Sequence, residues 1–218
     1  MNIHTWLKLA DCFPNCSCES SDNAWGNLSI AFWTSTFYFL AALGVYKKIK
    51  VRSFESEFWT FICINLSISS MLFHSFYIQS TLALDYASIT MALSFFTLFP
   101  LVKRVFKRKI LVEWTFIILF LLLWMLFMLL DKQSRIILCL TIFILSLPEV
   151  ANKLGRHPLR SRRFLYISCA LILISFACFL LEELKIWCDP SHWVQGHTFW
   201  HVGSALGLYL YGRWRFEV

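Results

Sequence analysis

The chain alternates between long apolar stretches and short segments that are rich in polar and charged residues. Each apolar stretch is close to the ~20 residues that a helix needs to cross the hydrocarbon core of a bilayer. A segment in hydrocarbon must satisfy its own backbone hydrogen bonds, and stretches of this length fit helices better than barrel strands. Seven helices can be marked, of which the fifth is the shortest: 28–46, 57–78, 82–102, 110–130, 135–151, 164–184 and 196–212. The pattern predicts an all-α fold, a seven-transmembrane-helix bundle.

The composition agrees with this pattern. Of the 218 residues, 58% are hydrophobic, and the mean hydropathy of +0.62 is too high for an ordinary soluble domain. We expect an outer N-terminal segment, residues 1–26, followed by a seven-helix membrane domain, residues 27–218. Residues 1–25 carry polar and acidic groups without an apolar run, so they do not predict a cleavable signal peptide. The first helix is therefore expected to direct the chain to the membrane.

The net charge of +7 would fit a nucleic-acid-binding protein if the basic residues were clustered, but they fall in alternate loops. Of the 20 Lys and Arg residues, 16 follow the first, third, fifth and seventh helices: Lys47, Lys48, Lys50, Arg52, Lys103, Arg104, Lys107, Arg108, Lys109, Lys153, Arg156, Arg160, Arg162, Arg163, Arg213 and Arg215. The positive-inside rule then places the N-terminus outside and the C-terminus in the cytosol. A multi-pass membrane protein with no nucleic-acid partner is predicted.

Two histidines open the last predicted helix. His197 and His201 stand four residues apart in the stretch QGHTFWH, so their imidazoles lie one turn apart on one helix face. This is metal-ligand spacing, although histidines in apolar helices often only bond to their neighbours. The zinc protease motif HExxH is excluded because position 198 is Thr. A zinc ion would need a third protein ligand from elsewhere in the chain.

The second and third predicted helices supply further polar groups at the same depth. His74 lies near the outer end of the second helix, with Ser70 on its face at i−4. Asp85 lies about one turn into the third helix, so the hairpin sets it level with His74, each roughly 6 Å below the outer surface by helical rise. Ionisable groups in a membrane are costly and mark functional sites. Since His197 and His201 enter at this same outer level, the residues predict a zinc site there.

Other positions carry weaker signals. Pro148 is expected to kink or end the fifth helix. Glu182 and Glu183 end the sixth helix and are expected to be solvated. Four cysteines fall on the outer side, where disulfides persist and three pairings are possible: Cys12, Cys16, Cys18 and Cys188.

Three motifs together resemble the signature of a superfamily of seven-helix membrane hydrolases: Ser70-x3-His74, Asp85 within LDYASIT, and His197-x3-His201. That superfamily includes the alkaline ceramidases, the adiponectin-receptor-like proteins and enzymes that remodel lipid anchors. The closing stretch CDPSHWVQGHTFWHVGSALGLYL is most similar to the ceramidase branch, and LDYASI is somewhat nearer the receptor-like branch. A bacterial-type ceramidase-like protein is favoured.

This resemblance implies roles for the matched residues. His74, His197 and His201 would be the zinc ligands, with Ser70 and Asp85 in the reaction centre. It also implies a disulfide between Cys18 and Cys188. The calcium motif of the alkaline ceramidases is matched poorly, because no Trp precedes Cys18 and Glu19 and the chain from Asn27 on lacks the expected carboxylate. The resemblance leaves calcium binding near Glu19 open.

The expected function is zinc-dependent hydrolysis of the amide bond of a ceramide-like membrane lipid, giving a sphingoid base and a free fatty acid. Asp85 would move protons and Ser70 would donate a hydrogen bond to the substrate carbonyl oxygen. The active site would lie in the outer half of the bilayer. Two alternatives stay open: a hydrolase of phospholipid acyl esters, and a seven-helix lipid receptor in which the zinc is structural.

Overall fold

The computed structural model describes residues 30–49, 52–106, 108–154, 159–187 and 195–216. The regular elements in these ranges are seven α-helices, with no β-strand among the described residues. Their bounds are α2 Ile30–Lys48, α3 Phe54–Phe76, α4 Gln79–Val105, α5 Lys109–Leu129, α6 Lys132–Leu154, α7 Leu159–Glu183 and α8 Gly196–Phe216. The all-α prediction is confirmed, and each helix overlaps one marked from the sequence. The expected outer segment, residues 1–26, lies outside the described residues.

The fifth predicted helix is longer in the structure than the sequence indicated. The helix α6 runs from Lys132 to Leu154 and continues past Pro148. Of the two effects expected of this proline, a kink or an end of the helix, the end does not occur. A proline removes one backbone hydrogen bond, and helices in an apolar environment tolerate this where neighbouring groups satisfy the carbonyl that is left.

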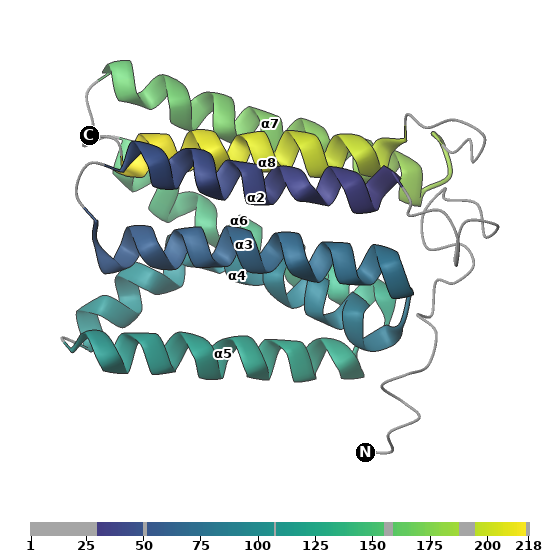
Figure 1. Ribbon diagram of the computed structural model, residues 1–218, viewed down its shortest axis with the longest axis horizontal. Helices are drawn as coiled ribbons and strands as arrows, with labels where there is room; N and C mark the ends of the chain where they lie inside the picture. Colours follow the sequence, from purple (N-terminus) through teal and green to yellow (C-terminus); the bar gives the residue numbers. More distant parts are fainter. Residues whose placement is uncertain (1–29, 50–51, 107, 155–158, 188–194, 217–218) are drawn as a thin grey trace.

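The helices pack in layers (Figure 1). In that view α7, α8 and α2 form one side, α3 and α4 the middle, and α5 the opposite side, while α6 lies behind. The direct packing pairs are α7 with α8, α2 with α8, α2 with α3, α3 with α4, and α4 with both α5 and α6. Consequently α8 is flanked by α2 and α7, and α3 lies close enough to share a site with it.

Close approach of α7 and α8 depends on small residues. A Cβ at Gly207 would lie 2.6 Å from Ile172 Cγ1 and 3.1 Å from the carbonyl oxygen of Ser168. The Ser168 hydroxyl also donates a hydrogen bond of 2.7 Å to the carbonyl oxygen of Gly207. Small residues let the backbones of apolar helices approach, and hydroxyls join them by hydrogen bonds across the interface.

The end of the bundle remote from the histidines is filled by aromatic side chains. Trp59 and Trp214 are buried there, and the Trp59 ring lies 5.1 Å from that of Tyr211. At the rim, Arg215 Nη2 lies 2.7 Å from Glu55 Oε1. This ion pair joins the C-terminal turn of α8 to the first turn of α3, so the two ends of these helices are tied together.

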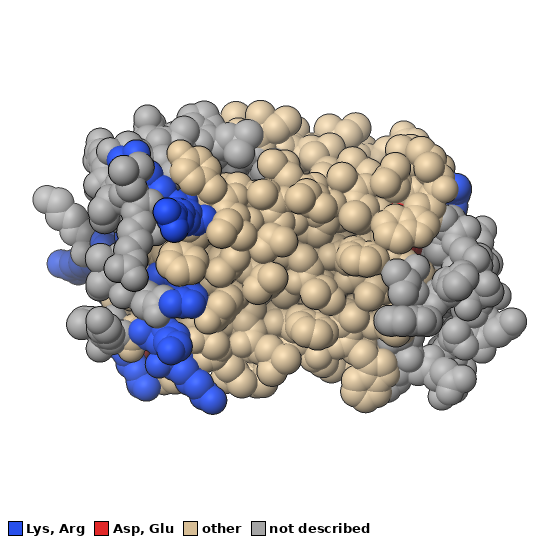
Figure 2. All heavy atoms as spheres, turned by 90° about the horizontal axis from the view of Figure 1, so that it is seen from above, with Lys and Arg blue, Asp and Glu red and all other residues tan. Residues whose placement is uncertain are grey.

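The surface is apolar around the middle of the bundle. Figure 2 shows a broad band without charged side chains and a cluster of Lys and Arg at one end. Large apolar side chains on several helices are exposed, among them Leu122, Leu145 and Ile174, which are 58%, 67% and 63% exposed. Three helical segments, Phe54–Phe76, Lys109–Leu129 and Arg162–Glu183, are long and apolar enough to cross a membrane. These features indicate a membrane-associated protein.

The packing of α7 on α8 predicts the effect of a side chain at Gly207. Gly207→Val should lower the free energy of unfolding by ~1–3 kcal/mol, because the added methyl groups meet Ile172 and the Ser168 backbone. Thermal unfolding in detergent measures the change. Leu206→Val, at the neighbouring position where the side chain is 46% exposed, is the control and should leave the melting temperature near that of the parent. An equal melting temperature for the Gly207 variant would contradict this packing.

Candidate metal centre

The first part of the site is set by the tight turn between α3 and α4. Tyr77 ends α3 in the left-handed conformation, with φ 48°, and its N–H donates to the carbonyl oxygen of Phe73 at 2.8 Å. The helix α4 starts at Gln79, so His74 in the last turn of α3 and Asp85 in the second turn of α4 lie at similar depths. Both side chains are buried, with 1% and 7% exposure. The hairpin therefore places His74 and Asp85 at one level near this end of the bundle.

The second part comes from the first turns of α8. His197 and His201 are both buried, and their ring centroids are 4.6 Å apart. They share one face of the helix because they are four residues apart. The start of α8 lies against α7, where a Cβ at Gly196 would be only 2.3 Å from the carbonyl oxygen of Cys178. Glycine at this position therefore lets the segment carrying His197 approach α7 closely.

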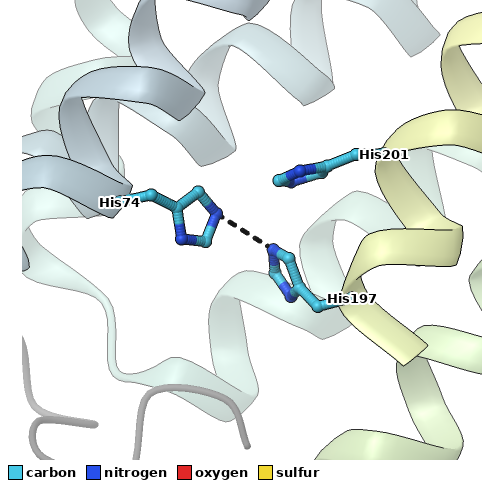
Figure 3. A group of neighbouring side chains, drawn as sticks. All are labelled: His74, His197 and His201. Atoms are coloured by element: carbon cyan, nitrogen blue, oxygen red, sulfur yellow. Dashed lines mark hydrogen bonds between the residues drawn. The ribbon is translucent and has the colours of Figure 1, made fainter. Parts of the chain in front are cut away.

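The three imidazoles converge on one point (Figure 3). One ligand nitrogen from each of His74, His197 and His201 lies within 4.8 Å of the others. The Nε2 atoms of His74 and His197 are 3.1 Å apart. Two nitrogens at 2.0–2.1 Å from one tetrahedral ion would be separated by roughly 3.3 Å. The spacing therefore matches two ligands of a single ion, and three buried histidines in this arrangement could bind a metal.

The ring of His201 is oriented by groups of α2. Its Nδ1 lies 3.0 Å from the carbonyl oxygen of Ala31, 3.1 Å from the Thr34 hydroxyl and 3.3 Å from the Ser35 hydroxyl. A carbonyl oxygen can only accept, so Nδ1 carries the proton in that bond and Nε2 keeps its lone pair. Metal-binding histidines commonly donate their second ring N–H to a backbone carbonyl in this way. The Nε2 atom of His201 is thus prepared to bind a cation.

Ser70 and Asp85 lie beside the histidines. The Ser70 hydroxyl is 3.3 Å from Nε2 of His201 and accepts a hydrogen bond of 3.0 Å from the Ser35 hydroxyl. The Asp85 carboxyl group interacts with Ser70, Ser69 and the imidazole of His74. Its Oδ1 is buried without a hydrogen-bond partner. A buried carboxylate oxygen of this kind is costly unless a donor or cation joins it.

An apolar cavity reaches the site from between α4 and α6 on one side and α7 and α8 on the other. It contains about 920 Å³ of empty space, its open mouth included. Asp85, Glu183 and His197 are among its lining residues, and most of the remaining wall is apolar: Phe73, Leu82, Ile89, Leu93, Ile136, Leu140, Ile172, Leu173, Phe176, Phe179 and Trp200. An apolar molecule in this cavity could bring a polar group to the histidines.

All five residues predicted for the site, Ser70, His74, Asp85, His197 and His201, meet in one place. Sequence reasoning missed the contribution of α2, because a Thr-Ser pair in an apolar helix looks like any other pair of small polar residues. The expectation that Glu182 is solvated is wrong: it is 1% exposed and accepts a hydrogen bond from the N–H of His197. The predicted Cys18–Cys188 disulfide and the possible calcium site near Glu19 lie outside the described residues.

No family model, curated protein or solved structure matches the chain. The resemblance to the seven-helix membrane hydrolases therefore rests on the motif residues alone and stays a prediction.

Metal binding can be tested by removing one imidazole. The parent protein is expected to hold about one zinc ion per chain after dialysis, whereas His201→Ala should lose it, because two imidazoles leave the ion under-coordinated. Elemental analysis of the purified protein measures the ratio. Phe199→Ala, on the outward face of the same turn where the ring is 45% exposed, should keep its zinc. Full retention of zinc by His201→Ala would show that this histidine is no ligand.

Proposed function

We propose that the protein is a zinc-dependent intramembrane hydrolase that cleaves the amide bond of a ceramide-like lipid. The observation that carries this proposal is the placement of three convergent histidines, a serine and an unpaired carboxylate oxygen beside an apolar cavity. The apolar wall of the cavity would suit a lipid tail, and the buried polar centre beside it is where the chemistry would take place.

The proposed topology has all seven helices crossing the membrane, with the N-terminus outside and the C-terminus in the cytosol. It is supported by the gathering of Lys and Arg at one end of the bundle (Figure 2) and by the uncharged band beside it. The histidine site lies toward the opposite end, near the α3–α4 turn and the start of α8 (Figure 1). It would therefore belong to the outer half of the bilayer.

Zinc is the proposed ion because three neutral imidazoles with one open position form a common catalytic zinc site. Imidazole also suits copper, iron and nickel. The oxygen groups nearby, Ser70 and Asp85, would leave the open position to water or substrate. An ion held in this way supplies a Lewis acid and an activated water at neutral pH.

Two side chains would carry the proton and charge changes of amide hydrolysis. Asp85 would accept a proton from the attacking water and deliver it to the nitrogen of the leaving amine as the C–N bond breaks. The Ser70 hydroxyl would donate a hydrogen bond to the substrate carbonyl oxygen as negative charge develops there. The Ser70 oxygen lies 3.0 Å from the Ser35 hydroxyl oxygen, a contact that would hold Ser70 in place beside the histidines.

The substrate class can be tested by product analysis. The parent protein in lipid nanodiscs should release free fatty acid from ceramide, and His197→Ala should not. Mass spectrometry of the lipid extract identifies the products. Release of fatty acid from phosphatidylcholine but not from ceramide would show that the protein hydrolyses esters and not amides. Release from neither lipid, by protein that holds its zinc, would favour a lipid receptor with structural zinc.

The proposed role of Asp85 gives the sharpest kinetic prediction. Asp85→Asn keeps the shape of the side chain but cannot accept the proton, so turnover should fall by roughly 10²- to 10⁴-fold. Zinc content must be measured in the same preparation, because loss of a nearby carboxylate can weaken metal binding by roughly 10- to 100-fold. A variant that keeps its zinc and hydrolyses lipid at the parent rate would rule out Asp85 as the base.

A further inference from the structure

The side chain of Glu182, in the last turn of α7, is buried next to the metal centre without being part of it. It is 1% exposed, and its Oε2 accepts a hydrogen bond of 2.6 Å from the backbone N–H of His197. Glutamate is almost never fully buried unless it is paired. Among the described residues, the cluster of ligand atoms includes the three histidines and not Glu182. The hydrogen bond from the backbone N–H of His197 connects Glu182 to the site.

The positive electrostatic potential at the N-terminus of α8 favours a carboxylate at this position. His197 is the second residue of α8, which begins at Gly196. The first turn of a helix carries unpaired N–H groups and roughly half a positive charge, which favours anions and disfavours cations. A divalent ion bound by His197 and His201 would sit close to that positive end in a water-poor environment. A carboxylate on the His197 N–H satisfies one of these donors and offsets the positive charge.

The backbone geometry holds the two groups together. Gly196 lies against α7 so closely that a Cβ would be 3.1 Å from the Cβ of Glu182 as well as 2.3 Å from the Cys178 carbonyl oxygen. The start of α8 is thus fixed on the turn of α7 that carries Glu182. A shift of this turn would move the backbone of His197 and the imidazole attached to it.

The charges in the buried interior are also consistent with a bound dication. Among the described residues, the buried carboxylates are Asp85 and Glu182, and both lie at this site. The buried cation, Arg135, donates to the carbonyl oxygen of Phe127 at the end of α5. Carboxylates next to the histidines favour a cation bound by neutral imidazoles.

We infer that Glu182 is a positioning residue for the metal: through the His197 N–H it fixes the direction of that ligand, and its charge offsets the N-terminus of α8 beside the ion. This inference rests on the metal-binding part of the proposed function. It does not depend on the substrate or on hydrolysis.

The test compares two variants of Glu182: one loses only the negative charge, and the other loses the charge and the hydrogen-bond acceptor. Glu182→Gln keeps an oxygen acceptor for the His197 N–H but removes the charge, whereas Glu182→Ala removes both. Zinc affinity, measured by competition with a chelator, should fall about 10-fold in the Gln variant and about 100-fold in the Ala variant. Hydrogen exchange of the His197 amide in zinc-free protein should be faster in the Ala variant and near the parent rate in the Gln variant.

The control is Glu113→Gln on α5, where the same change removes a carboxylate paired with Lys109 and 32% exposed; its zinc affinity should equal that of the parent. Parent-like affinity in both Glu182 variants would overturn the inference. The inference would also be overturned if both variants lost zinc affinity equally and both melted at a lower temperature than the parent without zinc. Glu182 would then stabilise the fold alone. A parent protein that binds no zinc would remove the proposed function and this inference together, whereas parent-like binding by the variants would remove the inference only.

Discussion

Polar groups in an apolar helix bundle must be satisfied by one another, and this constraint determines how the histidine site is built. The ring of His201 bonds to the carbonyl oxygen of Ala31 and lies beside the hydroxyls of Thr34 and Ser35. Ser35 continues the network to Ser70. The first helix of the bundle therefore does more than cover α3 and α8, because it sets which nitrogen of His201 is available to an ion.

As a result, the two ends of the bundle differ in the polarity and packing of their interiors. Around Trp59 and Trp214 the interior is closed by packed rings, and the rim is tied by the Arg215–Glu55 pair. Toward the opposite end the interior holds histidines, hydroxyls and two carboxylates beside an open cavity. A packed end that needs no water can anchor the helices, while the opposite end keeps open space beside the histidines.

Much of this arrangement could be predicted from the sequence because long apolar runs fix the number of helices, and four-residue spacing fixes the face on which His197 and His201 lie. The shared depth of His74 and Asp85 follows from the short turn after α3. The role of Glu182 could not be predicted, since a carboxylate at a helix end usually faces water and only the close packing of α7 on α8 buries it. Neither could the course of α6 past Pro148, which depends on its neighbours rather than on local preference.

We propose that the three imidazoles hold one ion with a fourth position open. X-ray absorption at the zinc edge of the purified protein tests it most directly, because that spectrum reports the kind, number and distance of the ligand atoms. We predict about three imidazole nitrogens at 2.0–2.1 Å and about one further light atom, with no sulfur. A first shell that contains sulfur, or four imidazoles with no open position, would contradict the account.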